Sequence, residues 1–175
     1  MKIILSAHFD LARPVMSIFM DTENLSGLVD NFAGVFAAYQ ASRNTKTPVH
    51  FTNFEELEFD GADAVAQKLS QETIVIVVDT TTDAQEKDAY IGNVYNLDEK
   101  LLKEALGNDI YFKEGLYEET EDETWIYGHK YNMKTLYFGI PIAPNYHDTN
   151  NKISLEAIDK ATKQLEKLIS YLQKN

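Results

Sequence analysis

The chain has 175 residues, of which 44% are hydrophobic and 11% aromatic, and its formal net charge is −12. This length suits one hydrophobic core and is short for two, so we expect a single catalytic domain over residues 1–175. The acidic charge argues against a nucleic-acid partner, because phosphate binding relies on clustered lysine and arginine. With no cysteine in the chain, disulfides and thiolate metal sites are excluded, and any metal would be held by histidine and carboxylate groups.

The beginning of the sequence shows neither the charged start nor the long apolar core of a signal peptide. No apolar run approaches the length needed to cross a bilayer, so we expect no membrane partner. A cytoplasmic location is the simplest interpretation, although a chain from which a leader had been removed would look the same.

Short β-branched runs alternate with amphipathic stretches, which is typical of an α/β fold with helices on both faces of a largely parallel sheet. The strands are predicted at residues 2–6, 17–20, 49–52, 73–78, 109–113 and 135–140. The segment 17–20 is expected at an edge. The segment 73–78 is a continuous run of isoleucine and valine, so we expect it at the centre of the sheet, buried on both faces.

Helices are predicted at residues 26–42, 61–69, 97–106 and from Ser154 onward, where the serine is a suitable N-cap. In the first helix the i, i+3, i+4, i+7 spacing predicts a buried face formed by Phe32, Val35, Phe36 and Tyr39. Gly107 is expected to cap the third helix. The acidic run at 118–123 predicts a solvated loop or a helix start.

Polar residues that directly follow strands are the first candidates for a site, because ligands of open α/β sheets bind beyond the carboxyl ends of the strands. This criterion selects His8, Asp10, Glu55, Glu56, Asp79 and His147, and Asp30 lies near the front of the first predicted helix, whose N-terminus should point toward the same edge. Each residue alone has an ordinary alternative: a polar turn, a solvated acid, a loop histidine or a helix cap. Their joint placement at one edge of one sheet favours a common site.

Two histidines among several carboxylates suit a metal centre. Zinc accepts imidazole nitrogen and carboxylate oxygen, and catalytic zinc sites leave one position open for water. Two such ions share a bridging carboxylate, lower the pKa of a shared water and polarise a carbonyl group, and a remaining acid can serve as the base. Adjacent side chains of an extended segment point in opposite directions, so the Glu55–Glu56 pair needs a turn or bulge to act at one site.

Five motifs in order resemble the co-catalytic zinc aminopeptidases and their carboxypeptidase and deacylase relatives. They are Ser-Ala-His-Phe-Asp at 6–10, Gly-Leu-Val-Asp-Asn-Phe-Ala-Gly at 27–34, Glu55-Glu56 followed by Gly61-Ala62, Asp79 after an isoleucine and valine strand, and Gly-Ile-Pro at 139–141 followed by Tyr146-His147. The resemblance spans nearly the whole chain. It implies a three-layer αβα sandwich of the phosphorylase/hydrolase-like type, with a mostly parallel mixed sheet.

The resemblance also implies a role for each site residue. His8 and Asp79 would hold one metal, Glu56 and His147 the other, and Asp30 would bridge the two. Glu55 would be the catalytic base, and Asp10 would orient His8 from behind. A cis peptide bond is expected between Asp30 and Asn31. The cofactors would be two divalent ions, zinc first, with cobalt or manganese as alternatives.

The implied function is hydrolysis of an amide bond, with an aminopeptidase acting on small peptides as the first candidate. A deacylase or carboxypeptidase acting on N-acyl amides or peptides at the same centre remains open, as does a relative that binds metal or peptide without turnover. The sequence gaps of 30 − 8 = 22 and 147 − 79 = 68 positions leave no room for the additional lid or dimerisation domain of many relatives. Because the chain begins close to the first ligand, we expect an uncovered sheet edge and a homo-oligomer.

Overall fold

The computed structural model describes residues 2–14, 17–84, 86–116, 122–143 and 147–175. Within these residues the main sheet contains, in spatial order, β4 (Val49–Thr52), β1 (Ile3–His8), β5 (Ile74–Thr81), β8 (Lys134–Pro141), β6 (Ala89–Tyr95) and β7 (Ile110–Phe112). The first four of these strands are parallel. Strand β6 runs antiparallel to β8, and β7 is parallel to β6. The sheet is therefore mixed and mostly parallel, as predicted.

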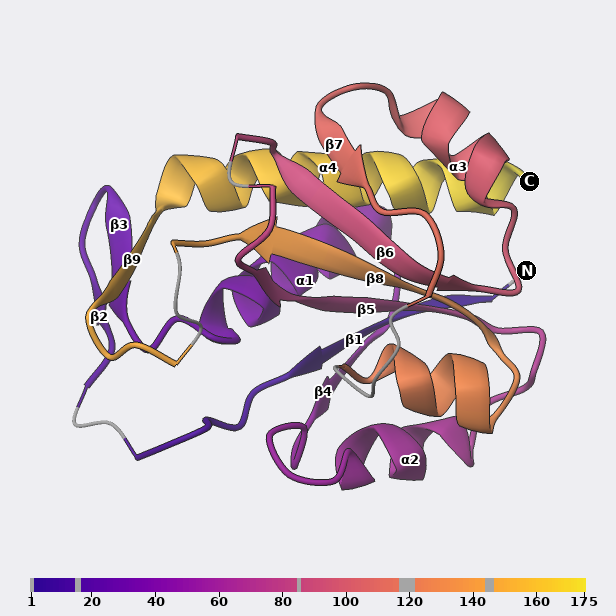
Figure 1. Cartoon of the computed structure of the whole chain (residues 1–175), viewed down its shortest axis with the longest axis horizontal. Coiled ribbons are helices and arrows are strands. Elements are labelled where there is room, and N and C mark those ends of the chain that lie inside the picture. Colours follow the sequence, from indigo (N-terminus) through magenta and orange to yellow (C-terminus); the bar gives the residue numbers. More distant parts are fainter. Residues whose placement is uncertain (1, 15–16, 85, 117–121, 144–146) are drawn as a thin grey trace.

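Helices cover both faces of this sheet (Figure 1). The helices α1 (Phe32–Thr45) and α4 (Leu155–Lys174) pack on one face, with α3 (Glu99–Leu106) against α4. The helix α2 (Asp60–Ala66) and the π-helical segment η1 (Trp125–Lys130) pack on the other face. A small antiparallel sheet of β2 (Phe19–Met20), β3 (Asn24–Gly27) and β9 (Asn151–Ser154) lies beside them. The expected three-layer αβα arrangement is confirmed.

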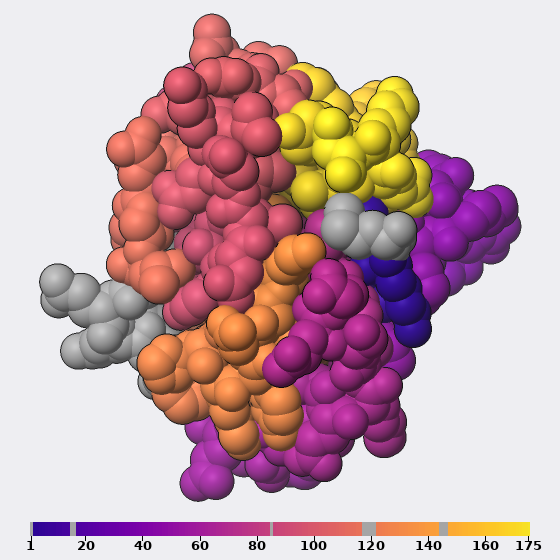
Figure 2. All heavy atoms as spheres, turned by 90° about the vertical axis from the view of Figure 1, so that its right-hand side faces the viewer, coloured from indigo at the N-terminus to yellow at the C-terminus, as the bar shows by residue number. Residues whose placement is uncertain are grey.

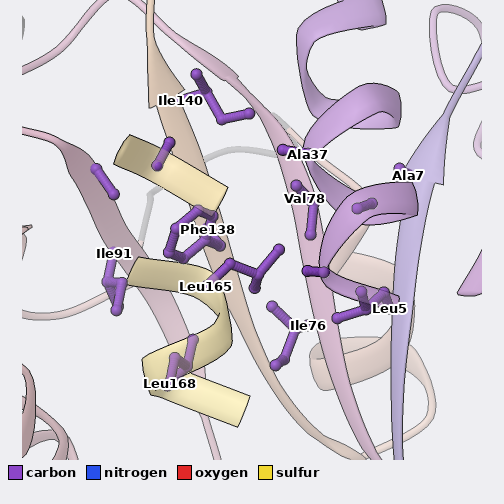
Figure 3. Close-up of a cluster of buried hydrophobic side chains, with 14 of the residues drawn as sticks. Leu5, Ala7, Ala37, Ile76, Val78, Ile91, Phe138, Ile140, Leu165 and Leu168 are labelled. Atoms are coloured by element: carbon purple, nitrogen blue, oxygen red, sulfur yellow. The ribbon is translucent and has the colours of Figure 1, made fainter. Parts of the chain in front are cut away.

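Each face of the sheet carries its own hydrophobic core. Figure 3 shows the larger one, where Leu5 of β1, Ile76 of β5 and Phe138 of β8 point toward Leu165 of α4. Burial on this scale is the main favourable contribution to folding, roughly 25 cal/mol for each Å² of apolar surface removed from water. The predicted central strand is β5, which is buried along its whole length.

The carboxyl ends of β1, β5 and β8 meet at one end of the molecule, on the left in Figure 1. Figure 2 shows the opposite end, where the first residues of β1, in indigo, emerge below the yellow α4. Asp98 and Ser154 cap α3 and α4 by accepting hydrogen bonds from Leu101 N and Ala157 N, and Gly107 ends α3, as expected.

The first helix differs from its prediction in both start and orientation. It begins at Phe32, because the preceding residues form β3, which pairs with β9, and Gly27 has a φ of 117° that no helix accepts. Its buried face consists of small residues: Ala33, Gly34, Ala37, Ala38 and Ala41. These let the helix approach the sheet and α4 closely. The predicted inward face was wrong for Phe36, which is 37% exposed, and for Tyr39, which is 46% exposed, whereas Phe32 and Val35 are half-buried against the core.

Other elements were not predicted at all. Strand β6 contains Gly92 and Asn93, which interrupt its apolar pattern, and its pairing with β8 is irregular between Gly92 and Tyr95. The acidic run was also misjudged in part. Residues 118–121 lie outside the described residues, but Asp122 and Glu123 are buried rather than solvated. Among the described residues, no helix is both long and apolar enough to cross a membrane.

Candidate metal centre

The structure brings all seven predicted site residues together at the carboxyl ends of the strands. His8 is the last residue of β1, Asp79 lies near the end of β5, and Asp30 directly precedes α1. Glu55 and Glu56 follow β4, and His147 follows β8. Strand order explains the convergence of the residues that follow β4, β1, β5 and β8, since these strands are consecutive parallel neighbours, and Asp30 reaches the same edge from the start of α1.

Asp30 lies between the two histidines. His8 Nε2 is 3.4 Å from Asp30 Oδ1, and His147 Nε2 is 3.6 Å from Asp30 Oδ2. His8 Nε2 is also 3.3 Å from Asp79 Oδ1, whereas His147 Nε2 is 3.3 Å from Glu56 Oε2. Each histidine therefore has its own second carboxylate, and Asp30 offers one oxygen to each side.

The Glu55–Glu56 pair is presented by a tight turn. Phe54 has a φ of 64°, and its carbonyl accepts hydrogen bonds from Glu58 N at 3.2 Å and Phe59 N at 2.8 Å. Gly61 fits behind the turn, because a Cβ at this position would lie 2.3 Å from the carbonyl oxygen of Asn53. The turn that two adjacent site glutamates require is therefore present.

Asp10 connects this turn to His8. Its Oδ1 lies 3.5 Å from His8 Nδ1 and accepts a hydrogen bond from the backbone N–H of Glu55 at 3.2 Å. Its Oδ2 accepts from the backbone N–H of Glu56 at 3.3 Å. Burial opposes ionisation of Asp10, but these contacts keep its pKa below the ordinary value. One carboxylate thus faces both the His8 ring and the peptide that carries the two glutamates.

The peptide bond between Asp30 and Asn31 is cis, as the resemblance implied. The Asn31 side chain donates a hydrogen bond to the carbonyl of Val78 at 2.9 Å and so ties the start of α1 to β5 beside Asp79. Gly34 leaves space for this side chain, since a Cβ there would lie 1.9 Å from Asn31 Oδ1.

The electrostatics of the cluster reflect crowded, buried acids. Burial and the charge of Asp79 raise the pKa of Glu55 to about 9. Burial, together with the charge of Asp30, raises the pKa of Asp79 to about 7 against the opposing charge of His8. Burial alone would lower the pKa of His8, but Asp79, Asp10 and Asp30 raise it well above its usual value. The cluster of site residues therefore has too little positive charge to balance its carboxylates.

The donor set fits divalent cations. Two groups of donor atoms each lie within 4.8 Å of one another: His8 with Glu55 and Asp79, and His8 with Asp30 and Glu56. Asp30 Oδ1 and Glu56 Oε1 are buried and accept no hydrogen bond with good geometry, which is costly unless another partner binds them. Imidazole with carboxylate oxygens suits zinc, cobalt or manganese. One difference from the predicted roles is that Glu55, assigned as base, lies within the first donor group.

A cavity of about 400 Å³ opens in front of the cluster and extends beyond it. Its further wall contains residues that sequence reasoning missed: Thr80, Thr81, Asp83, Lys113, Asp122 and Tyr137. Thr80 and Thr81 belong to the end of β5 and could have been selected by the strand-end criterion. Lys113 follows β7, on the antiparallel side of the sheet, and Asp122 lies just before η1, so that criterion applies to neither residue.

Behind the cluster lies a buried polar network that the sequence did not indicate. The hydroxyl of Ser6, on β1, donates to Glu123 Oε2 at 2.7 Å and lies 3.0 Å from the hydroxyl of Tyr127. Burial raises the pKa of Glu123. Its neighbour Asp122 accepts hydrogen bonds from Thr124 N at 2.7 Å and from Asn93 Nδ2 at 2.9 Å.

No protein-family model matches the chain, and no curated protein matches it in sequence. Solved structures match its fold. A TET1 peptidase of Pyrococcus horikoshii is 19% identical, with 87% of this chain and 52% of that chain covered and a TM-score of 0.61. An aminopeptidase of the archaeon Desulfurococcus kamchatkensis is 13% identical, with 87% and 51% covered and a TM-score of 0.65. LapA of Legionella is 15% identical, with 98% and 52% covered and a TM-score of 0.67.

At these identities the likeness concerns the fold, and the chain spans about half the length of each of these proteins. The fold is thus of the kind found in aminopeptidases.

Proposed function

We propose that this chain is a metal-dependent hydrolase of amide bonds, and that its first activity is that of an aminopeptidase on small peptides. The observation that carries the proposal is the position of Asp30, with one oxygen 3.4 Å from His8 and the other 3.6 Å from His147. A carboxylate between two histidines, each with a further acid of its own, suits a two-metal centre. The fold shared with a peptidase and an aminopeptidase supports the same conclusion.

In this proposal His8 and Asp79 would hold one ion, Glu56 and His147 would hold the other, and Asp30 would contribute an oxygen to each. When bound, two divalent ions would lower the pKa of a shared water and polarise the scissile carbonyl group. Glu55 takes the proton of the attacking water on a carboxylate oxygen and returns it to the leaving amine. Asp10 keeps the His8 ring in one orientation and fixes the turn that carries Glu55. The proposed unit is one catalytic domain without a lid.

The test is metal analysis followed by hydrolysis assays, with and without a chelator, on a panel of aminoacyl amides, N-acyl amino acids and peptides with free C-termini. We expect two equivalents of divalent metal and chelator-sensitive cleavage of the aminoacyl amides. Cleavage confined to N-acyl or C-terminal substrates would replace the aminopeptidase by a deacylase or carboxypeptidase. Two bound metals without any turnover would favour a binding protein.

We further propose that the chain acts as a homo-oligomer. The Pyrococcus horikoshii TET1 peptidase assembles into a tetrahedron or a large octahedral shell, which supports self-association as a property of such folds.

A further inference from the structure

A buried acid behind the proposed metal centre has no part in the proposed reaction so far. Glu123 is only 1% exposed, and its Oε2 accepts a hydrogen bond from the Ser6 hydroxyl at 2.7 Å. Its neighbour Asp122 lines the cavity, whereas Glu123 does not, so Glu123 does not touch a substrate held there. Burial of a carboxyl group costs free energy unless hydrogen bonds offset it, and satisfied buried networks fix one particular geometry.

Glu123 reaches the main sheet from a third element. Its carbonyl oxygen accepts hydrogen bonds from Ile126 N at 3.1 Å and Tyr127 N at 3.3 Å and so joins it to the first turn of η1. The segment η1, the short orange helix next to α2 in Figure 1, packs on the face of the sheet where the hydroxyl of Tyr127 meets that of Ser6. Turns of π-helix are rare and occur frequently at functional sites. The position of the Glu123 carboxyl is therefore set independently of β1 and β4.

This carboxyl lies between the ends of β1 and β4. On one side is Ser6, two residues before His8, so both of these side chains project from the same face of β1. On the other side is Thr52, the partner of His8 in the register of β1 and β4, whose hydroxyl is close enough to oppose the rise in the pKa of Glu123. Glu123 Oε1 and Thr52 Oγ1 are both buried without a hydrogen bond of good geometry, so a bond between them would satisfy both atoms.

A neutral carboxyl group suits this position. Burial raises the pKa of Glu123, which favours the protonated form. A protonated carboxyl has one oxygen that accepts, here from Ser6, and one hydroxyl that can donate, here toward Thr52. A glutamine side chain offers the same pair of functions, whereas alanine offers neither.

The two strands that Glu123 contacts carry the parts of the site whose separation matters for proton transfer. Glu55 follows Thr52 by three residues, and its Oε2 lies 3.9 Å from His8 Nε2. Asp10 links His8 to the Glu55–Glu56 turn beyond the strand ends, and Glu123 lies at the strand ends themselves. The charge of Glu123 also contributes to the raised pKa of Glu55, as expected for acids that lie close together.

We propose that Glu123 is a positioning residue, whose carboxyl joins the ends of β1 and β4 and so holds Glu55 at the distance from His8 that proton transfer from the attacking water requires. This inference rests on the proposed function, because only there is Glu55 the base. Glu123 acts through Ser6 and Thr52 and contacts neither metal ligand nor substrate. A displacement of about 1 Å at a reacting group can reduce the rate by on the order of 100-fold.

The first test measures the link between the strands without relying on activity. Hydrogen exchange followed by mass spectrometry reports the backbone N–H groups of residues 53–58, of which those of Glu55 and Glu56 donate to Asp10. We expect Glu123→Ala to speed this exchange by about 5-fold to 30-fold, the effect of losing one or two hydrogen bonds. Glu123→Gln should exchange like the wild type. Thr135→Val is the matched control, because it removes a buried hydroxyl that bonds to Val75 O at the far ends of β8 and β5.

The second test measures kcat, KM and metal content of the same variants. We expect Glu123→Ala to lower kcat by on the order of 100-fold with KM and metal content at the wild-type level, and Glu123→Gln to restore kcat. Circular dichroism establishes that each variant is folded, and Thr52→Val, which keeps the shape of the side chain, replaces Glu123→Ala if that variant is unfolded.

The outcomes separate this inference from the proposed function. Unchanged exchange in Glu123→Ala or Thr52→Val, an unchanged kcat, or an equal loss of kcat in Thr135→Val would overturn the positioning role. A loss of metal or a rise in KM in place of the fall in kcat would overturn it as well. Faster exchange in the variants of a protein that hydrolyses no substrate would confirm the link between β1 and β4 and would refute the proposed function.

Discussion

Two sets of buried acids lie close together in this molecule, and they differ in what surrounds them. Asp122 and Glu123 are held by hydroxyl, amide and backbone N–H groups of the protein. Asp30, Glu56 and Asp79 instead face two histidines and one another, and two of their buried oxygens accept no hydrogen bond. In the first set the chain supplies hydrogen bonds to three of the four carboxylate oxygens and leaves only Glu123 Oε1 without one, whereas the second set combines unpaired oxygens with two imidazoles and so suits a cation. Metal binding is therefore proposed for the second set.

The strongest test of this distinction replaces Glu55, the acid proposed to accept a proton from water without binding metal. Glu55→Gln keeps size and polarity but cannot accept the water's proton. We expect hydrolysis to fall by on the order of 100-fold to 10,000-fold while the metal content stays at the wild-type level. Rate assays and metal analysis of the same preparation measure both quantities. Glu58→Gln, in the exposed part of the same turn, is the matched control and should change neither.

For Glu56, we expect the loss of metal to come before the loss of activity, in contrast to Glu55. Glu56→Gln removes a charged ligand, so metal occupancy should fall first and activity should follow. Replacement of His50 or His129, both exposed, should leave the metal content unchanged. Loss of metal from Glu55→Gln with full retention in Glu56→Gln would contradict the assigned roles and would favour Glu55 as a ligand, consistent with its place among the His8 donor atoms.

The metal requirement also predicts a change in stability. A ligand that binds only the folded state stabilises it by about 2.7 kcal/mol at a free concentration of 100 times its Kd. Zinc added to chelator-treated protein should therefore raise the melting temperature, and excess chelator should reverse the rise. Asp30→Asn should lose most of this gain, and Glu123→Gln should keep it, as differential scanning calorimetry can measure. If zinc raised the melting temperatures of the two variants equally, the two sets of acids would not differ in metal binding.

Asp10 tests how the site is oriented. Asp10→Asn keeps the shape of the side chain but loses the charge beside His8 and one of the two acceptors for the Glu55–Glu56 turn. Groups that hydrogen-bond to a metal ligand typically contribute about 10-fold to 100-fold to metal affinity or activity. We expect Asp10→Asn to lose metal affinity in this range. Asp21→Asn is a matched control, because Asp21 also accepts from two backbone N–H groups but is exposed. A metal titration that gives equal affinities for both variants would exclude an orienting role.

The sequence predicted the parallel half of the molecule better than the antiparallel half. A strand buried on both faces, such as β5, has an uninterrupted run of apolar residues that can be recognised in the sequence. Residues that follow parallel strands lie at one edge of the sheet, which is why His8, Glu56 and Asp79 could be selected together. Strand β6 carries Gly92 and Asn93 inside its pattern, and the buried Glu123 accepts its hydrogen bond from Ser6, which lies far away in the chain. Such long-range packing leaves no local periodicity in the sequence.

The prediction of which face of α1 is buried was wrong for a related reason. The helical spacing of large apolar residues predicted which face is apolar, but close packing against the sheet selected the alanine face instead. Phe36 and Tyr39 remain at the surface, where they line an apolar groove together with Phe51 of β4.

The smallest expected effect concerns Glu123, the acid of the buried polar network behind the cluster. Burial raises the pKa of Glu123 above that of a glutamate in the unfolded chain, while the hydroxyls of Thr52 and Ser6 oppose the rise. Between the unfolded and the folded pKa, the folded state binds more protons, so the free energy of unfolding must decrease as the pH increases through that interval. Each unit of difference between the two pKa values corresponds to about 1.4 kcal/mol.

Glu123→Gln keeps the size of the side chain and an oxygen that can accept from Ser6, but it cannot titrate. The wild type should therefore lose stability relative to this variant between mildly acidic and mildly alkaline pH. Urea unfolding of both chelator-treated proteins at the two pH values measures the difference, which includes the effect of the Glu123 charge on the pKa of Glu55. A difference that does not change with pH would show that the folded protein leaves the pKa of Glu123 unshifted, and Glu123 would then no longer be an acid kept neutral by burial.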